Sequence, residues 1–301
     1  MGHNLAMTSP KIGMYGIGLM GHGIASNLVR KGYSLGFFEH PGNQPVADLL
    51  AAGAHGFSDR RALAAGSDVI ILVLTGSPQV EEVLTGPGGV LETLRPGSLV
   101  IDCSTALPAS TARMAAAVQA AGSRFLDAPM TRTPKEAAEG RLNLLVGGDA
   151  AVLEEARPVL ACFAENITHV GPVGAGHGMK LAHNFVSLGM VTLLAEASAS
   201  ASGHGITPDA FVEVLAKGGG GGIALDRIKP FLLAGDTGGL KFSLANARKD
   251  LDYYGQMAAA SGAHRAVAEA VLATLALGLS RAEGQGREGA LVPELAALLQ
   301  T

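Results

Sequence analysis

Apolar and polar residues follow different patterns in the two parts of the chain. Up to about residue 172, short apolar runs that suit single strands alternate with segments of helical spacing. The run DVIILVL at 68–74 is apolar enough to be covered on both faces of a parallel sheet. We predict strands at 11–15, 34–38, 54–57, 68–74, 98–102, 124–127, 143–146 and 166–170, and helices at 22–32, 46–52, 108–121 and 150–163. This alternation is typical of an α/β domain with a mainly parallel sheet.

From about residue 173 the strand signals stop and the pattern is helical. The longest segment, GAGHGMKLAHNFVSLGMVTLLAEASASASGHG at 174–205, is bounded by glycines and predicts one long helix. Breaks follow at 203–208, 218–222 and 235–239. The glycine run 218–222 is not predicted to be a phosphate loop, because no strand precedes it and no Lys-Ser/Thr pair follows. We predict a flexible, solvent-facing turn there, with a mobile cover for the cleft as the alternative. We therefore expect an α/β domain over 1–172 and an all-helical domain over 173–301, entered through the long helix.

The composition narrows the class of protein. A chain of 301 residues that is 48% hydrophobic and 16% charged is long enough for two domains with buried cores. The formal net charge of −4, without a basic block, argues against nucleic acid as a partner. No signal core is seen, and every apolar run of 18 residues contains Asn, Glu or His, so no membrane span is predicted. Cys103 and Cys162 lack CxxC or HxxxH companions, so we expect no disulfide framework, no metal site and a reducing, cytoplasmic setting.

A glycine-rich turn, GIGLMG, follows the first predicted strand and precedes a helix. Gly16 would permit the tight turn, Gly18 would let backbone approach a pyrophosphate, and Gly21 would allow close helix packing. Free N–H groups at the helix start would face the phosphates. A bare pattern of this kind is often only a turn, but its context between strand and helix favours dinucleotide binding by Gly16, Ile17, Gly18, Leu19, Met20 and Gly21.

Glu39 ends the second predicted strand, 18 residues after Gly21. A carboxylate there can bind the ribose hydroxyls of the cofactor and repel a 2′-phosphate, which favours NAD over NADP. His40 beside it leaves room for both cofactors, and a solvated glutamate at a strand end is the alternative.

Further candidates lie after the strands at 68–74 and 98–102. Ligands of parallel sheets bind beyond the carboxyl ends of the strands, which places Leu74, Thr75, Ser104 and Thr105 near a cofactor. Hydroxyls before a helix are as often caps.

Lys180, His183 and Asn184 share one face of the long helix, because they are spaced i, i+3 and i+4. An ammonium, an imidazole and an amide would be costly to bury unless they met a partner or a ligand. The alternative is a core helix with a solvated polar end.

Taken in order, five motifs resemble the β-hydroxyacid dehydrogenases, a family that includes 3-hydroxyisobutyrate dehydrogenase and tartronate semialdehyde (2-hydroxy-3-oxopropionate) reductase. They are GIGLMG, the Ser104-Thr105 pair before Pro108, FLDAPMTRTPKEAAEGRLNLLVGGD, GAGHGMKLAHN and FSLANARKDLDYY. The resemblance covers residues 11–300 and implies an N-terminal Rossmann domain, a helical C-terminal domain and an active cleft between them.

The resemblance also implies roles for residues. Lys180 matches the catalytic lysine and Asn184 the asparagine that orients the substrate, while Thr105 matches a hydroxyl beside the nicotinamide. Phe242, Lys249 and Asp250 match groups that close on cofactor and substrate from the C-terminal domain. In alcohol oxidation a base must take the hydroxyl proton as hydride leaves, and a lysine can fill that role without a metal.

Two departures from the family pattern concern the substrate. Most relatives read Ser-Gly-Gly where this chain has Thr131, Arg132 and Thr133, a segment that holds the substrate carboxylate in the family. Arg132, with help from Lys135 and Arg141, could hold a second anionic group; the alternative is that it turns to solvent or pairs with Glu136 or Glu139. His183 replaces the usual asparagine, and a neutral imidazole can still donate and accept one bond there.

Three functions compete at this stage. The first is an NAD(P)-dependent dehydrogenase that interconverts a small anionic 3-hydroxy acid and its semialdehyde. The second is imine reduction, which Lys180 disfavours because relatives of that kind generally replace the lysine. The third is a cofactor-binding scaffold without turnover, which the intact Lys180 and Asn184 disfavour. Apolar surface on the long helix and on 263–279 predicts a homodimer or homotetramer.

Overall fold

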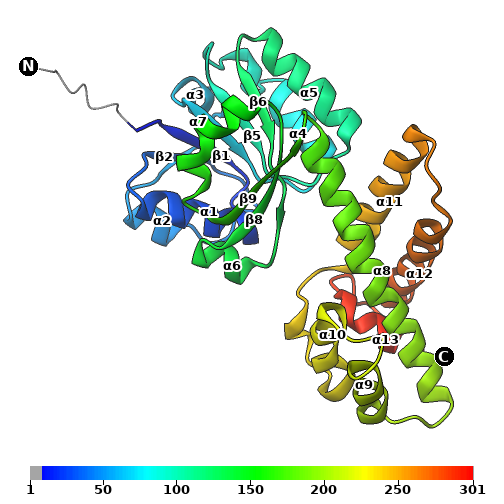
Figure 1. The fold of residues 1–301 in the computed structure, drawn as a ribbon. Helices are drawn as coiled ribbons and strands as arrows, with labels where there is room; N and C mark the ends of the chain where they lie inside the picture. Colours follow the sequence, from blue (N-terminus) through cyan, green and yellow to red (C-terminus); the bar gives the residue numbers. More distant parts are fainter. Residues whose placement is uncertain (1–8, 301) are drawn as a thin grey trace, which may run out of the picture. The chain divides into compact units, whose positions relative to one another are not determined.

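The computed structural model describes residues 9–300 (Figure 1). The chain divides into two compact units, one up to Lys180 and the other from Leu181. The predicted division at 172/173 lies eight residues earlier. The difference arises because the first turn of the long helix is hydrogen-bonded to the sheet of the first unit, through the side chain of Asp127.

The first unit is built on one nine-stranded sheet with the order β3-β2-β1-β4-β5-β6-β8-β7, in which β9 also pairs with β8. Strands β1 to β6 pair in parallel, whereas β8 is antiparallel to β6 and β7. The mainly parallel sheet is therefore confirmed. The strands are β1 (Ile12–Tyr15), β2 (Leu35–Phe38), β3 (His55–Phe57), β4 (Val69–Leu72), β5 (Leu99–Asp102), β6 (Arg124–Asp127), β7 (Met130–Thr131), β8 (Leu142–Gly147) and β9 (Ala164–Gly171).

Helices cover both faces of this sheet, and the strands alternate between two cores. In β4, Val69 and Ile71 belong to one core and Ile70 and Leu72 to the other. All four are buried, as expected for a strand covered on both faces. The helices are α1 (Leu19–Arg30), α2 (Ala47–Ala51), α3 (Arg60–Ala65), α4 (Ser77–Thr85), α5 (Pro108–Ala120), α6 (Pro134–Glu139) and α7 (Ala150–Leu160), with the 3-10 turn η1 (Val90–Glu92).

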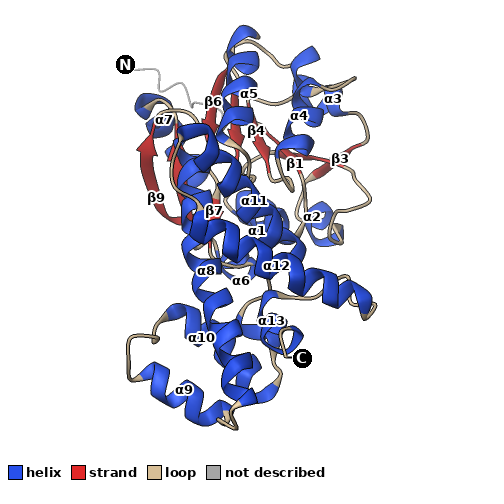
Figure 2. Cartoon of the chain, turned by 90° about the vertical axis from the view of Figure 1, so that its right-hand side faces the viewer, coloured by secondary structure: helices blue, strands red, loops and turns tan. Residues whose placement is uncertain are grey.

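The named elements of the second unit are all helices, with one isolated β-bridge between Ser243 and Leu291, and Figure 2 shows strands only in the first unit. Leu188, Leu225, Leu251 and Leu275 bring four helices into one core. The glycine run 218–222 joins α9 to α10. The elements are α8 (Ala175–Gly203), α9 (Pro208–Ala216), α10 (Ile223–Ala234), η2 (Thr237–Gly239), α11 (Leu244–Ser261), α12 (Ala266–Gly284), η3 (Val292–Glu294) and α13 (Leu295–Leu298).

Helix α8 is long, and its apolar residues are partly buried in a core and partly exposed. By length and composition alone it could cross a membrane, with a mean hydropathy of 1.3 in its most apolar window. Core helices of soluble proteins pass the same test, and Leu188, Val191 and Ala195 pack in the core of the second unit. Val186 and Leu193, by contrast, are 58% and 64% exposed, so α8 also carries uncovered apolar surface.

Candidate active site

The glycine-rich turn joins β1 to α1 with almost no spare room. Gly16 has φ +99°, and a Cβ there would lie 2.1 Å from the Val73 carbonyl oxygen. A Cβ on Gly21 would lie 2.0 Å from the Gly16 carbonyl oxygen, so α1 can start this close to β1 only with glycine. A Cβ on Gly18 would meet nothing within 4 Å. The space beside Gly18, at the N-terminus of α1, is therefore open, and the predicted contact with a pyrophosphate stays a prediction.

Asn43 supports this turn, and sequence reasoning missed it. Its Oδ1 accepts a hydrogen bond from the Ile17 N–H at 3.2 Å, and its Nδ2 donates to the Phe38 carbonyl at 3.0 Å. The Gln44 N–H also donates to the Ile17 carbonyl at 2.7 Å. A single amide in a loop gives no periodic signal, so this brace could be found only in the structure.

Glu39 lies directly after β2, where the sequence placed it. Its N–H donates to the Phe57 carbonyl of β3 at 2.9 Å. A Cβ on Gly56 would lie 2.3 Å from Glu39 Oε1, so the carboxylate reaches across the end of β3. The side chain is exposed and can meet a ligand at this end of the sheet.

The turns after β4 and β5 are tied together. The Ser104 hydroxyl accepts a hydrogen bond from the Leu74 N–H at 2.9 Å. Neither Thr75 nor Thr105 occupies an N-cap position, because Gly76 and Leu107 are the N-cap residues of α4 and α5. Thr75 is exposed and Thr105 half-buried.

Lys180, His183 and Asn184 lie on consecutive turns of α8. Lys180 and His183 are half-buried, whereas Asn184 is only 5% exposed. Asn184 Nδ2 donates to Asp250 Oδ2 at 2.6 Å, and His183 Nδ1 lies 3.1 Å from Asn184 Oδ1. These contacts favour a built polar site over a merely solvated helix end.

Asp250 contacts Asn184, and its predicted contact with substrate stays a prediction. It is 2% exposed, and its two oxygens face Asn184 Nδ2 and, at 2.8 Å, Lys249 Nζ. Lys249 Nζ also lies 5.0 Å from the centre of the Tyr253 ring. Asp250 therefore orients Asn184 within the second unit. Phe242 packs partly buried against the core of that unit, and the predicted roles of Phe242 and Lys249 at the cofactor stay predictions.

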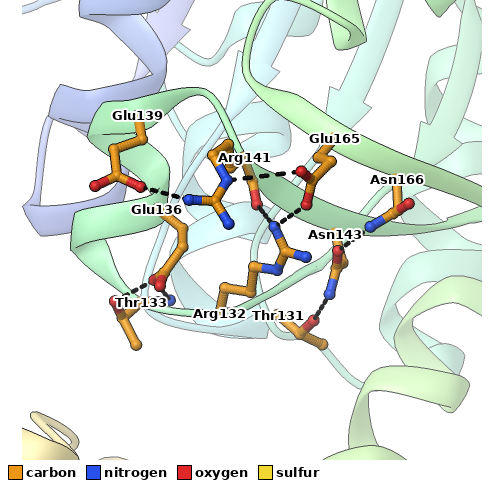
Figure 3. A network of polar contacts seen from close by, with 9 residues as sticks. All are labelled: Thr131, Arg132, Thr133, Glu136, Glu139, Arg141, Asn143, Glu165 and Asn166. Carbon is orange, nitrogen blue, oxygen red and sulfur yellow. Dashed lines mark hydrogen bonds and ion pairs between the residues drawn. The ribbon is translucent and has the colours of Figure 1, made fainter.

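The segment 131–133 links β7 to α6, and Figure 3 shows its polar contacts. Asn143 Nδ2 donates to the Thr131 hydroxyl at 3.2 Å, and Asn166 Nδ2 donates to Asn143 Oδ1 at 2.8 Å. Thr133 begins α6 in a capping box with Glu136. Its hydroxyl is therefore used by the helix, and its predicted contact with substrate stays a prediction.

Arg132 forms an ion pair, as one of the two alternatives predicted, but its partner is Glu165. Its guanidinium contacts the Glu165 carboxylate and the Arg141 carbonyl (Figure 3), not Glu136 or Glu139. Hydrogen bonding from Arg132 lowers the pKa of the Glu165 carboxyl. Arg141 pairs with Glu139 at 3.1 Å and lies 3.6 Å from Glu165. Arg132 has φ +81°, a left-handed conformation that is uncommon outside glycine.

A cluster of buried polar side chains lies at the carboxyl ends of β5 and β6 and was not predicted. Asp102, Asp127 and His177 are each at most 1% exposed, and His177 belongs to the first turn of α8. Their signal in the sequence is weak: two predicted strands end in Asp, and a His starts the long helix.

Cys103 and Cys162 are both free and buried, and burial raises the pKa of both thiols. Across residues 9–300, no three His, Cys, Asp or Glu side chains are grouped so that they could hold a metal ion.

Comparison with known families matches both parts of the chain. Residues 11–171 match the family described as the NAD binding domain of 6-phosphogluconate dehydrogenase. Residues 174–293 match the family described as NAD-binding of NADP-dependent 3-hydroxyisobutyrate dehydrogenase. The two matches meet at the start of α8.

Individual proteins are similar over most of the chain. A 2-(hydroxymethyl)glutarate dehydrogenase of Eubacterium barkeri is 34% identical over 81% of this chain and 80% of its own length. A 2-hydroxy-3-oxopropionate reductase of Escherichia coli is 36% identical over 72% of this chain and 73% of its own. A solved structure of Mycobacterium tuberculosis 3-hydroxyisobutyrate dehydrogenase with L-serine superposes with a TM-score of 0.84 at 27% identity, covering 97% of this chain and 100% of the other.

Proposed function

The chain belongs to the β-hydroxyacid dehydrogenase family, and from this premise we propose that it interconverts a small 3-hydroxy acid and its semialdehyde or keto form, with Lys180 as general acid/base. It is an NAD(P)-dependent oxidoreductase that acts on CH–OH donors. The observation that carries the role of Lys180 is its position on α8, one turn before the buried Asn184.

The chemistry needs a proton carrier and an orienting group. The turn 16–21 would hold NAD(P), which would supply the hydride acceptor in oxidation and the hydride donor in reduction. Lys180 takes the proton of the substrate hydroxyl in oxidation and returns it to the carbonyl oxygen in reduction. Asn184 orients the substrate, and because Asp250 accepts from its Nδ2, the direction of the amide is fixed. His183 and the Thr131 hydroxyl complete the proposed substrate contacts.

NAD is the proposed cofactor, with NADP as the alternative. The support is the exposed Glu39 carboxylate at the end of β2, where it would repel a 2′-phosphate. The turn 16–21, Leu74, Thr75 and Thr105 are the proposed contacts in the first unit.

The substrate is proposed to carry at least one carboxylate, held near Thr131. A second anionic group at Arg132 would require the ion pair with Glu165 to open. In favour of a second group, one relative acts on a substituted glutarate, which is a dicarboxylate. A panel with one and two anionic groups separates the two possibilities.

We expect a homodimer or homotetramer formed through the helical unit. Val186, Met190 and Leu193 are 58%, 44% and 64% exposed and share one side of α8. On α12, Val267 and Leu277 are 64% and 45% exposed. Apolar surface of this extent favours contact with a second copy.

The decisive experiment is an activity screen with a matched variant. Purified protein is tested with NAD⁺ and NADP⁺ on L-serine, 3-hydroxyisobutyrate and 2-(hydroxymethyl)glutarate, and with NADH and NADPH on 2-hydroxy-3-oxopropionate, by absorbance of the reduced cofactor. Lys180→Ala should lower kcat by ~10² to 10⁴, with NADH binding by fluorescence retained. Turnover that survives nearly intact in Lys180→Ala would remove Lys180 from the mechanism.

A further inference from the structure

The first turn of α8 is fixed from outside the helix. Asp127, the last residue of β6, accepts hydrogen bonds from the Gly174 N–H at 2.8 Å and the His177 N–H at 2.9 Å. These are N–H groups at the start of a helix, which need an acceptor. A Cβ on Gly176 would lie 2.4 Å from the Leu145 carbonyl oxygen, so this turn packs backbone to backbone on β8. The place of this turn therefore determines where Lys180, one turn further along, emerges.

The His177 ring extends this anchor to two other elements. Its Nδ1 lies 2.7 Å from the Thr111 hydroxyl of α5, and its Nε2 lies 3.8 Å from Asp102 Oδ2 at the end of β5. Nδ1 also lies 3.9 Å from Asp127 Oδ2. Asp102 Oδ2 and His177 Nε2 are fully buried, and neither has a hydrogen-bond partner, so their 3.8 Å contact is electrostatic.

The buried atoms Asp102 Oδ2 and His177 Nε2 face each other, and their contact is attractive only if one of them carries a proton. If neither carried hydrogen, two lone pairs would face each other at high cost. The proton can belong to Nε2 of a neutral or charged imidazole, or to the Asp102 carboxyl, and each arrangement gives an attractive Asp102–His177 contact. The pair thus ties α8 to β5.

The same contact reaches the turns proposed to meet the cofactor. Asp102 Oδ1 accepts from the Ser104 N–H at 2.9 Å, and the Ser104 hydroxyl accepts from the Leu74 N–H. One continuous chain of contacts therefore runs from His177 through Asp102 and Ser104 to Leu74, within the first unit.

We propose that His177 is a positioning residue, which together with Asp102 holds the first turn of α8 to the carboxyl ends of the strands and so sets the place of the Lys180 amine relative to the turns after β4 and β5. The inference rests on the proposed role of Lys180. It assigns no proton transfer with substrate to His177, which is 0% exposed.

A double-mutant cycle tests this and separates it from the function of Lys180. The variants are His177→Leu, Lys180→Ala and the double variant, each assayed with the best substrate of the panel above. His177→Leu should lower kcat by ~10-fold or more, since small misplacements of a catalytic group are costly, while NADH binding is unchanged. In the Lys180→Ala background the same change should have no further effect on kcat, because the group being positioned is gone.

Two controls keep the outcome clear. His177→Gln retains an amide that can bond to Asp102, and it should recover most of the lost kcat. Ser110 lies on α5 beside Thr111 and donates a 2.6 Å hydrogen bond to Glu81 of α4. Ser110→Ala removes this bond, and it should lower the stability of the protein without changing kcat. If His177→Leu does not fold, Asp102→Asn takes its place in the cycle.

The outcomes are distinct. A loss of kcat from His177→Leu only when Lys180 is present supports the proposal. An equal factor in both backgrounds, or no loss in either, overturns it while leaving Lys180 as the acid/base. Unchanged turnover in Lys180→Ala would instead overturn the proposed function.

Discussion

Two polar networks hold parts of the candidate site, and they differ in how water reaches them. The cluster of Asp102, Asp127 and His177 is at most 1% exposed. The network around segment 131–133 is open to solvent, with 26% of the Arg132 side chain and 45% of the Glu165 side chain exposed. In the first, a lost partner leaves a group that water cannot satisfy; in the second, water replaces the partner. The buried cluster should therefore fix geometry, and the exposed network should be adjustable.

The largest effect on stability is expected at Asp127. Asp127→Ala leaves two N–H groups at the start of α8 without their acceptor, and it should lower the free energy of unfolding by about 3 kcal/mol or more. Urea denaturation of wild type and variant measures the difference, with Glu165→Ala as the exposed control. A loss at Asp127 no larger than that at Glu165 would contradict the contrast between the networks.

The pH dependence of stability should have opposite signs in the two networks. Burial raises the pKa of Asp102 above 3.8. The contribution of Asp102 to the free energy of unfolding is therefore fully present below pH 3.8 and is lost as pH rises through the folded-state pKa. Hydrogen bonding from Arg132 lowers the pKa of Glu165 below 4.5, so its contribution is present above pH 4.5 and is lost as pH falls through the folded-state pKa. His177 and Asp127 are the charged or titratable groups that face Asp102.

Two variants separate these contributions. As pH rises, the free energy of unfolding of wild type should fall relative to that of Asp102→Asn. Over the same range it should rise relative to that of Glu165→Gln. Unfolding curves between pH 3 and pH 7 measure both differences. Slopes of the same sign would contradict the assignment.

The smallest effect is expected at Arg132. Arg132→Gly removes an exposed ion pair, which contributes little because water replaces the partner, but it also releases a left-handed conformation that costs about 1 kcal/mol or more. The net change should be near zero, whereas Arg132→Ala keeps the strain and should be less stable than Arg132→Gly. Thermal unfolding of the pair measures this. A glycine variant less stable than the alanine variant would show that residue 132 is not strained.

Much of this arrangement was readable from the sequence, because local signals carry it. The buried run at 68–74 gave a strand with both faces covered, and the glycines of the turn 16–21 gave the strand–turn–helix unit. Helices without a pronounced pattern were missed, among them α3, α4 and α6, as was the two-residue strand β7.

The missed contacts in the site are long-range. Asp127 and His177 are 50 residues apart, and Thr111 and His177 are 66 apart, so no window of sequence shows their meeting. The pairing of Arg132 with Glu165 spans 33 residues and depends on β8 and β9 lying side by side. Residue types predicted that polar groups gather near strand ends, and only the fold determined which ones meet.

Chemical rescue tests whether the Lys180 amine carries the proton in the reaction. Turnover of Lys180→Ala is measured with increasing methylammonium in the assay, at fixed ionic strength. We expect the kcat of Lys180→Ala to be low without amine and to rise with the amine concentration, while the wild-type kcat does not change. Wild-type kcat in the variant without amine would contradict it.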